Sequence, residues 1–469
     1  MADRTQTAVI GGGPGGYVAA FRAADLGQQV TLIDLDDDPG GVCLYRGCIP
    51  SKALLHVAKL LAEAREAEEW GISFGNPKID LDKLRAFKDR VVANMTGGLG
   101  QLAKGRKVTY VQGRARFTGA QSLAVETAEG TQELEFDNAV LATGSRPTIL
   151  PALDIGSDNI MDSTGALELA DVPERLLVVG GGIIGLELGQ VYSALGSAVS
   201  VVEMTDGLVP PGDRDLVRVL HKRLEGQFEQ VRLQTKVTSV SEGEGHLQVT
   251  MEPADGDDSV ESYDRILLSI GRRPNSEDIG LENTRVQVGE LGFVQVDLQR
   301  RTAEPTIFAV GDVIGSALAH TASHEGIVAA EVIAGKRSAF EPKAIPSVVY
   351  TDPELAWCGL TEAEAKAQGR TVKVSRFPWG ASGRAATLDR NDGVTKLIVD
   401  PESERILGVG IAGPGASELI AEGVLAVEMA AVVDDVALSI HPHPTLSETM
   451  MEAAEFFHGL SPHVMPPRR

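Results

Sequence analysis

The sequence predicts an α/β fold in which two Rossmann-like dinucleotide-binding domains are followed by a C-terminal α+β domain. Three observations predict it: a glycine-rich strand–turn–helix pattern occurs twice, both copies end in a similar strand, and the pattern changes near residue 345. The chain has 469 residues, of which 43% are hydrophobic and 52 are glycine. At roughly 150 residues per domain, this length accommodates about three domains.

The first glycine-rich pattern follows the apolar segment TAVI, which begins at Thr7. Gly11, Gly13 and Gly16 form a G-x-G-x-x-G turn before a helical segment, and the next strand-like segment, QVTLID, ends at Asp34. Glycines let the backbone approach a pyrophosphate at a helix N-terminus, and the acid accepts hydrogen bonds from a ribose. The segment therefore has the complete pattern of a dinucleotide site.

The second copy has the same residue types at the same spacing. Gly180, Gly182 and Gly185 follow the strand-like RLLVV, and the segment AVSVVE ends at Glu203. The interval from first glycine to acid is 23 residues in both copies, from 34−11 and from 203−180. A single glycine-rich turn is weak evidence, but two in full context imply two bound dinucleotides.

The two copies also end alike, since NAVLATGSRP (138–147) resembles RILLSIGRRP (265–274), each after an alternating stretch typical of antiparallel strands. The first glycines are offset by 169 residues, whereas Gly144 and Gly271 are offset by 127. The first copy therefore carries 42 additional residues, the difference between 169 and 127.

Two of the three cysteines, Cys43 and Cys48, lie in this additional stretch, within GGVCLYRGCIPSKALLH. A zinc site usually needs four ligands, and only one short-spaced pair is present, so we expect no metal site. A structural disulfide is unusual in a reducing compartment. Inert buried cysteines are common and remain an alternative.

The spacing of the two cysteines favours redox-active thiols. Residues five apart in an ideal helix are separated by a rise of about 7.5 Å, so a bond between Cys43 and Cys48 requires a distorted helix. Gly47 permits the distortion, and Ile49-Pro50-Ser51 is expected to begin the regular helix. The positive end of that helix favours a thiolate at Cys48. A dithiol poised in this way stores two electrons.

From about residue 345 the segments VTKLIVD, RILGVGIAG and ASELIAEGVLAVEMA predict a separate α+β domain. Near its end, a proline-rich loop turns into a helix in HPHPTLSETMMEAAE. From spacing alone, His443 is a loop histidine that caps this helix. Cys358 is expected to be an ordinary buried cysteine.

The net charge of −23 disfavours nucleic acid as a partner. No apolar run approaches the ~20 residues that span a bilayer, and the first apolar segment is expected to be a strand rather than a signal peptide. Three cysteines are too few for a secreted disulfide framework. We therefore expect a cytoplasmic protein with no membrane partner.

Further motifs accompany these patterns: LATGSRP, VVGGGIIGLELGQVY, SIGRRPN, TIFAVGDV, YTDPELAWCGL and HPHPTLSETMMEAAE. Together they resemble the flavin-dependent pyridine nucleotide–disulfide oxidoreductases over nearly the whole chain. The resemblance implies four segments, which are an FAD-binding domain with the inserted redox helix (1–148), an NAD-binding domain (149–275), a central segment that completes the FAD domain (276–345) and a C-terminal interface domain for dimerisation (346–469).

The resemblance also implies which residues hold FAD and NAD. Asp312 is expected near the ribityl chain of FAD, and Ile184 over the nicotinamide pocket. The residues implied for FAD are Gly11, Gly13, Gly16, Asp34, Lys52, Gly113, Thr143, Gly144, Gly311, Asp312 and Ala319. Those implied for NAD are Gly180, Gly182, Ile184, Gly185, Glu203 and Gly271.

The same resemblance implies catalytic roles. Cys48 would lie against the flavin as the charge-transfer thiolate, and Cys43 would exchange with the substrate disulfide. Lys52 would approach the flavin and pair with Glu187. In the C-terminal motif His443 would be the general base and Glu448 its orienting carboxylate. Because this loop reaches the flavin of the partner subunit in the family, the resemblance implies a homodimer.

The reaction implied is oxidation of protein-bound dihydrolipoamide to lipoamide with reduction of NAD⁺. The implied partners are lipoyl domains and the dihydrolipoyl acyltransferase core of 2-oxoacid dehydrogenase complexes, or the glycine cleavage complex. Alternatives are an NADP-dependent disulfide reductase of the same family and a non-enzymatic dinucleotide sensor. The tail lacks the additional cysteine pair of mercuric reductases, and a sensor would not need Cys43, Cys48 and His443 together.

The chain departs from the family's usual residues at four positions. Asp34 stands where Glu is usual, Tyr45 and Arg46 where Asn and Val are common, and Thr321 where Lys is usual. The shorter acid is expected to serve the same role. Tyr45 and Arg46 lie between the two cysteines, so they bear on the packing of the redox segment.

Overall fold

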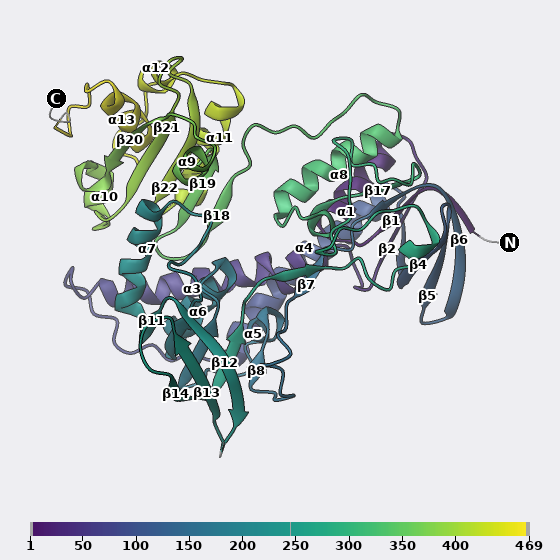
Figure 1. Cartoon of the computed structure of the whole chain (residues 1–469), viewed down its shortest axis with the longest axis horizontal. Helices are drawn as coiled ribbons and strands as arrows, with labels where there is room; N and C mark the ends of the chain where they lie inside the picture. Colours follow the sequence, from purple (N-terminus) through teal and green to yellow (C-terminus); the bar gives the residue numbers. More distant parts are fainter. Residues whose placement is uncertain (1–2, 244, 466–469) are drawn as a thin grey trace.

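The computed structural model describes residues 3–243 and 245–465. Figure 1 shows three bodies: an N-terminal sheet on the right, a second sheet at the bottom, and a C-terminal sheet at the upper left. The first two are joined by chain crossings near β7, and the last follows a long connection from α8. The predicted α/β class with two Rossmann-like units and a C-terminal α+β domain is confirmed.

The N-terminal sheet has seven strands in the order β3-β2-β1-β6-β5-β4, with β17 paired to β6. Strands β1, β2, β3, β6 and β17 are parallel, and β4 and β5 extend the sheet antiparallel. Helices α1 (Pro14–Asp25) and α8 (Ala319–Ile333) pack against each other. The strands are β1 (Asp3–Ile10), β2 (Val30–Asp34), β3 (Thr109–Gln112), β4 (Arg114–Gly119), β5 (Ser122–Thr127), β6 (Gly130–Leu141) and β17 (Ile307–Ala309).

β17 comes from far along the chain, after the whole second domain. Its parallel pairing with β6, Ile307 opposite Ala139, supports the expectation that segment 276–345 completes the first domain. That segment also contains the short 3-10 helices η1 (Leu281–Asn283) and η2 (Gly311–Ile314). The four domain boundaries themselves stay predictions.

The second sheet is fully parallel, with strands in the order β11-β10-β9-β15-β8. A separate antiparallel sheet, β12-β13-β14, forms the excursion expected before the closing strand β15. The elements are β8 (Ile160–Met161), α5 (Ser163–Glu168), β9 (Arg175–Val179), α6 (Ile183–Leu195), β10 (Ala198–Val202), α7 (Arg214–Gln227), β11 (Gln230–Arg232), β12 (Thr235–Glu242), β13 (Leu247–Pro253), β14 (Ser259–Tyr263) and β15 (Arg265–Leu268).

The two repeated endings pair with each other. β7 (Ser145–Pro147) and β16 (Arg272–Pro274) form an antiparallel two-stranded ribbon, with Arg273 opposite Arg146. These are the segments by which the chain leaves the first domain and returns to it. The two crossings therefore lie side by side.

The C-terminal sheet is antiparallel in the order β18-β19-β22-β21-β20. Helix α11 packs on β19 and β22, and α13 on β20 and β21. The elements are β18 (Ser347–Val349), β19 (Leu355–Gly359), α9 (Glu362–Ala367), β20 (Lys373–Pro378), η3 (Trp379–Ala381), α10 (Gly383–Thr387), β21 (Val394–Val399), β22 (Ile406–Ala412), α11 (Ala416–Glu428), α12 (Val433–Ala437) and α13 (Glu448–Phe457).

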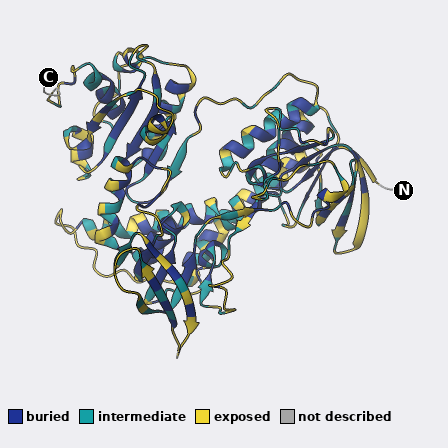
Figure 2. Ribbon diagram, viewed as in Figure 1, coloured by how far each residue is buried: buried dark blue, intermediate teal, exposed yellow. Residues whose placement is uncertain are grey.

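The additional stretch of the first copy forms three helices, α2 (Gly41–Arg46), α3 (Cys48–Glu66) and α4 (Leu81–Gly105). α3 packs on α6 of the second domain. One apolar core contains Leu54 of α3, Leu186 of α6 and Leu355 of β19, so the redox helix is fixed against both later domains. Figure 2 shows buried residues along all three sheets and along the contact faces of these helices.

Within residues 3–243 and 245–465, no helix is both long enough and apolar enough to cross a membrane. Cys358 is buried as expected, with 1% of its surface exposed, and burial raises the pKa of its thiol to about 12.

Candidate active site

Both glycine-rich turns are built on the same backbone contact. Gly11 has φ of +102°, and a Cβ there would collide with the carbonyl oxygen of Ala142 after β6. Gly180 has φ of +110°, and a Cβ would lie 2.5 Å from the carbonyl oxygen of Ser269 after β15. Only glycine fits either position. The sheet edge therefore approaches each turn as the sequence pattern predicts.

The helices after these turns have open N-termini. The N-cap residues Gly13 of α1 and Gly182 of α6 have extended backbones and provide no side-chain cap. A Cβ on Gly182 would meet no atom within 4 Å. The free N–H groups and the positive helix end are what a dinucleotide pyrophosphate requires.

The acid at the end of each second strand is held by the middle residue of its glycine turn. Asp34 Oδ2 accepts a hydrogen bond from Gly12 N, and Glu203 Oε2 accepts one of 2.7 Å from Gly181 N. Burial raises the pKa of Asp34 despite its backbone donors. The two carboxylates thus occupy equivalent positions beside the turns, where a ribose would bind.

The remaining residues predicted for FAD lie around the same sheet edge. Gly113 N donates a 2.7 Å hydrogen bond to the carbonyl of Asp34. Gly144 has φ of +70°, and its carbonyl accepts from Asn275 N at 2.9 Å. Thr143 Oγ1 donates to the carbonyl of Asn275 at 2.7 Å. Ala319 is the first residue of α8, and Gly271, predicted for NAD, has φ of +119° before β16.

Asp312 is held by side chains that the sequence did not single out. Ser145 Oγ donates to Asp312 Oδ2, and Arg272 Nε donates to Ser145 Oγ at 2.7 Å while lying 3.8 Å from Asp312. Both come from the β7–β16 ribbon. The signal that would have found them is the repeated ending itself, GSRP and GRRP.

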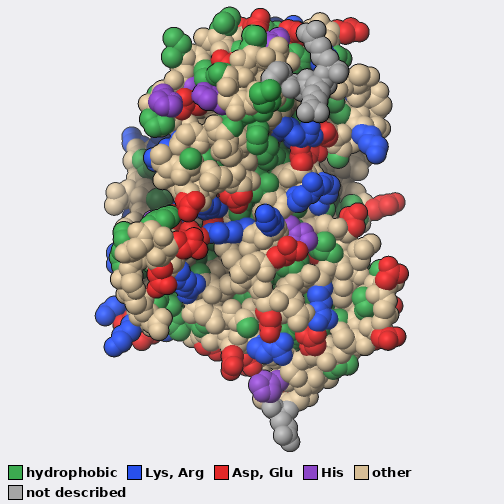
Figure 3. All heavy atoms as spheres, turned by 90° about the vertical axis from the view of Figure 1, so that its left-hand side faces the viewer, with side chains coloured by type: hydrophobic (Ala, Val, Ile, Leu, Met, Phe, Trp, Pro, Cys, Tyr) green, Lys and Arg blue, Asp and Glu red, His purple; other side chains and the backbone are tan. Residues whose placement is uncertain are grey.

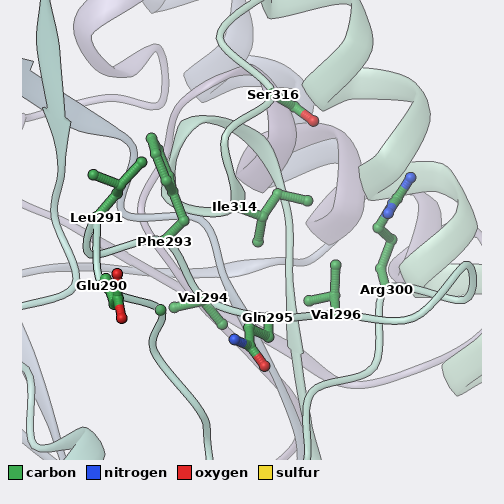
Figure 4. A pocket seen from close by; sticks show the side chains of 10 residues that line it. Glu290, Leu291, Phe293, Val294, Gln295, Val296, Arg300, Ile314 and Ser316 are labelled. Carbon is green, nitrogen blue, oxygen red and sulfur yellow. The ribbon is translucent and has the colours of Figure 1, made fainter.

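The turn that carries Gly311 and Asp312 rests on a buried carboxylate. Glu325 of α8 has no exposed surface, accepts from Gly311 N at 2.8 Å, and burial raises its pKa. Ser316 Oγ donates to it at 2.7 Å, and Arg300 Nε lies 3.6 Å away. Arg300 and Ser316 line a cavity of about 620 Å³ together with Phe293 and Ile314 (Figure 4). None of its lining residues is among the predicted site residues.

The cysteine pair lies at the break between two helices. α2 ends at Arg46 and α3 begins at Cys48, one residue before the predicted Ile49. A Cβ on Gly47 would lie 2.9 Å from the carbonyl oxygen of Val42, so the break requires glycine. Cys43 is half-buried and Cys48 exposed, and both are free thiols.

The two thiols differ in acidity. A hydrogen bond from Cys43 and the positive charge of Lys52 lower the pKa of Cys48 to about 7, against an opposing desolvation of the sulfur. The same hydrogen bond, with burial, raises the pKa of Cys43. One thiolate therefore forms readily near neutral pH, and it is Cys48.

Lys52 joins three parts of the chain. The residue lies one helical turn after Cys48 on α3, and its Nζ lies 2.7 Å from Glu187 Oε2 on α6. Glu187 is buried, and its Oε1 accepts from Tyr350 N at 2.9 Å. Lys52 Nζ also lies 4.4 Å from the centroid of the Tyr350 ring. Ile184, near the start of α6, is 36% exposed on the same helix.

The predicted base and its carboxylate are in contact. His443 Nδ1 donates a 2.9 Å hydrogen bond to Glu448 Oε1, and Thr445 N donates to Glu448 Oε2 at 2.7 Å. His443 therefore bonds the carboxylate at the start of α13 and does not itself cap the helix. Its side chain is 76% exposed, so Nε2 is free for a substrate.

Within the described part of one chain, no hydrogen bond or ion pair links His443 or Glu448 to Cys43 or Cys48. Figure 3 shows histidine side chains on the upper part of the face formed by the C-terminal domain. The structure thus brings together the dithiol, Lys52 and Glu187, and separately the His443–Glu448 dyad.

Two dinucleotide turns on either side of a thiol pair, one member of which is acidic, define a flavin- and pyridine nucleotide-dependent disulfide oxidoreductase. Residues 5–326 match the family described as pyridine nucleotide-disulphide oxidoreductase, and residues 345–454 match its dimerisation domain. The chain belongs to this family, which confirms the predicted membership and enzyme class. FAD and NAD(H) are the cofactors that go with it.

The chain is similar to curated enzymes along its whole length. It is 50% identical over 457 residues to the dihydrolipoyl dehydrogenase of Vibrio cholerae, covering 97% of this chain and 96% of that one. It is 46% identical over 461 residues to the dihydrolipoyl dehydrogenase of Thermus scotoductus, covering 97% and 98%.

Solved structures agree with this fold. LpdA from Mycobacterium tuberculosis superposes with a TM-score of 0.88 at 29% identity, covering 96% of this chain and 99% of that one. The flavoprotein disulfide reductase RclA from Escherichia coli superposes with a TM-score of 0.86 at 27% identity, covering 97% and 99%.

Proposed function

We propose that this chain oxidises protein-bound dihydrolipoamide to lipoamide and reduces NAD⁺. The observation that carries the proposal is the acidic Cys48 thiol beside Cys43 and Lys52, at the start of a helix between two dinucleotide turns. The similarity to dihydrolipoyl dehydrogenases over 97% of the chain supports the substrate.

The thiol chemistry balances as two exchanges. A thiolate of dihydrolipoamide attacks Cys43 Sγ of the oxidised pair, which breaks the Cys43–Cys48 bond and releases Cys48 as thiolate. The second substrate thiol then displaces Cys43 and closes the lipoamide disulfide. The substrate has lost two electrons and two protons. The cysteine pair has gained both electrons, one proton goes to His443 and the other to Cys43 Sγ, and Cys48 stays a thiolate. The lowered pKa of Cys48 makes it the better leaving group.

Bound FAD would supply the two-electron chemistry that connects the dithiol with NAD⁺. The residues that would hold FAD are the first glycine turn, Asp34 and Asp312, and those that would hold NAD are the second turn and Glu203. Lys52, fixed by Glu187, keeps a positive charge near the Cys48 sulfur. That charge stabilises the thiolate until its electrons leave.

We assign the substrate proton to His443. Its Nδ1 is occupied by Glu448, so the unprotonated Nε2 accepts the proton of the attacking thiol. Because the dyad and the cysteine pair are separate in one chain, a second copy would supply the histidine. The family dimerisation domain and the exposed Leu438 and Ile440 beside this loop, 80% and 98% exposed, support a homodimer.

The wider setting is also part of the proposal. Lipoyl domains and the dihydrolipoyl acyltransferase core of a 2-oxoacid dehydrogenase complex, or the glycine cleavage complex, are the proposed partners. The names of the relatives support the lipoyl substrate. A chain with three cysteines, two of them assigned to thiol exchange, suits the cytoplasm, the proposed compartment.

Turnover of a panel of substrates tests the function directly. We expect the purified protein to reduce NAD⁺ with dihydrolipoamide and to show far lower activity with glutathione disulfide and either reduced cofactor. His443→Gln should lower dihydrolipoamide oxidation by at least about a hundredfold while FAD stays bound. Glu448→Gln should lower the rate by a smaller factor, because Glu448 orients the base and is not itself the base. Full turnover of the His443 variant, or preference for glutathione disulfide, would contradict the proposal.

A further inference from the structure

The C-terminal tail returns along α13, the helix that begins with Glu448. Ser461 Oγ donates a 2.6 Å hydrogen bond to Glu452 Oε2, and His463 Nδ1 donates to Glu452 Oε1. Val464 packs against the core of the C-terminal domain. Two hydrogen bonds and one apolar contact therefore fix residues 461–464 on this helix.

Glu452 is a buried carboxylate whose hydrogen-bond partner, His463, lies at the surface. Its side chain is 6% exposed, whereas that of His463 is 59% exposed. A buried carboxylate is costly unless it is paired and hydrogen-bonded. An imidazole that holds a second proton carries a positive charge, and His463 is placed in direct contact with Glu452.

Glu452 lies four residues after Glu448, so the two carboxylates share one face of α13, one turn apart. Like charges at this spacing repel each other. Burial acts to raise the pKa of Glu448, yet the Thr445 N–H, His443 and, from further away, His463 bring it below its usual value. The tail histidine is therefore within electrostatic range of the dyad.

We propose that Glu452 and His463 are positioning residues of the reaction, and that this pair sets the charge seen by the His443–Glu448 dyad. The tail supplies a positive charge that cancels Glu452. Without it, a second negative charge would stand beside Glu448 and would hold the proton on His443 more tightly. The inference rests on the proposed role of His443 as base.

Beside the dyad, His441 pairs with Glu422 of α11 at 2.8 Å, and the charged groups further along α13 have partners or positions of their own. Glu455 lies on the same face, and burial and Glu452 raise its pKa while His463 lowers it. His458 pairs with Asp434 of α12 at 3.0 Å. Lys373 of β20 lies 5.4 Å from the Phe457 ring centroid, at the far end of the helix from Glu448.

Two single variants should move the reaction in opposite directions. In the FAD-bound full-length enzyme, His463→Gln should shift the acid limb of kcat/KM for dihydrolipoamide upward by about 0.5 pH unit. Glu452→Gln should shift it downward by about the same amount, because one negative charge is removed. The double variant should return near the wild-type profile, and His463→Lys should keep it.

The control is His458→Gln, which removes a neighbouring histidine paired with Asp434 and should leave the limb in place. A structural role alone would lower kcat in both single variants or move both limbs the same way. Either result, or an unmoved limb in His463→Gln, would overturn the inference. If Glu452→Gln does not fold, the comparison of His463→Gln with His463→Lys decides it.

A second measurement does not depend on the substrate. Hydrogen exchange at the imidazole Cε1 position of His443, followed against pH by mass spectrometry, gives a midpoint for each variant. The midpoint should rise in His463→Gln and fall in Glu452→Gln. If these shifts appear without dihydrolipoamide turnover, the proposed function fails and the electrostatic coupling stands. If turnover is normal and the midpoints are unchanged, the coupling fails and the function stands.

Discussion

The pKa of Cys48 is lowered by Cys43 on α2 and by Lys52 on α3, which the break at Gly47 brings to the same sulfur. Gly47 allows α3 to begin at the cysteine, Cys43 donates to its sulfur, and Lys52 lies one turn further along the same helix. The sequence predicts this much, because glycine, proline and lysine stand at fixed offsets from the cysteine. The Lys52–Glu187 contact required the resemblance to the family, since 135 residues separate the pair.

At the residue scale, the charge-transfer band of the reduced enzyme should depend on Cys48. The Cys48 thiol loses its proton as pH rises through its pKa of about 7. The band, which requires the thiolate, should therefore grow above that pH and fade below it. Anaerobic absorbance of the two-electron-reduced holoenzyme measures this. Cys48→Ser should abolish the band. If Cys43→Ser abolishes it and Cys48→Ser does not, the two cysteine roles are reversed.

Cofactor choice is a second property of one residue. Glu203 Oε1 accepts from Thr205 N and Thr205 Oγ1, both at 2.8 Å, so its carboxylate is fixed where the adenosine ribose would lie. It would repel the 2′-phosphate of NADP, and the following residues MTDGLV provide no cation. We expect NAD to be preferred by at least about a hundredfold in kcat/KM. Equal rates with both cofactors would refute the role of Glu203.

At the scale of elements, α2 is attached to the loop after β2 by Tyr45 and Arg46, two of the four residues that depart from the family. Arg46 donates to both Asp36 oxygens, at 2.8 and 2.6 Å, and Tyr45 Oη donates to the carbonyl of Asp38 at 3.0 Å. The sequence alone did not predict this contact, because the acidic run 36–38 is typical of a solvated loop. Charge complementarity between the loop and LYRGC was the available signal.

This attachment predicts an effect on FAD binding. Asp36 follows Asp34 by two residues, so Arg46→Leu should loosen the loop that carries the ribose acid. A bidentate Arg–carboxylate pair contributes about 1 to 2 kcal/mol, so FAD dissociation should become roughly tenfold easier. Titration of the apo-protein with FAD measures it. Arg106→Leu, which removes the 3.0 Å contact with Asp25 in the same domain, is the control and should have little effect. Equal losses in both variants would contradict the assignment.

The His443–Glu448 dyad shows what local patterns cannot supply. The loop and helix of HPHPTLSETMMEAAE were predictable, but spacing alone favoured a histidine that caps the helix. In the structure Glu448 accepts from both Thr445 N and His443, so the carboxylate fixes the preceding loop and the histidine together, and no side chain caps the helix. Whether His443 bonds the helix backbone or the Glu448 carboxylate depends on the directions of side chains at the start of the helix, and the hydrophobic periodicity of the sequence does not give those directions.

At the scale of the whole molecule, a buried lysine joins the second and third bodies. Lys396 of β21 is 1% exposed, and its Nζ lies 2.7 Å from Asp213, 2.7 Å from Asp215 and 2.9 Å from Glu362. The first two acids precede or begin α7, and the third begins α9. The βαβ pattern predicted the second body and the strand and helix segments after residue 345 predicted the third, but contacts between bodies depend on residues with no local signature.

Removal of that lysine should destabilise the chain strongly. Lys396→Met leaves three carboxylates facing one another, and breaking a buried pair in this way costs about 3 to 5 kcal/mol. Burial raises the pKa of Asp215, but Lys396 and Arg376 together lower it by more, so the pKa of the folded state lies below the ordinary value. The charged Asp215 therefore stabilises the fold at pH values above that ordinary pKa, and this stabilisation is lost as the pH falls through the folded-state pKa. The difference in free energy of unfolding between Lys396→Met and the wild type should therefore become smaller as pH falls toward 4, where the carboxylates begin to take up protons. Denaturant unfolding at several pH values measures it.

Arg370→Met is the control for Lys396→Met, because its 3.4 Å contact with Asp400 is exposed to solvent and should contribute little to stability. A Lys396 variant that unfolds like this control at every pH would show that the buried cluster does not hold the two bodies together.

The β7–β16 ribbon has a consequence for how such a chain can be assembled from parts. Thr148 N donates a 3.0 Å hydrogen bond to the carbonyl of Gly271, so the stretch between them begins and ends at neighbouring points. A segment with adjacent ends is the kind that tolerates insertion into, and exchange between, host proteins. Residues 148–271 therefore have the geometry of an inserted segment. A short linker would join the two chain ends left by their removal, and their own adjacent ends would connect to neighbouring positions in another protein.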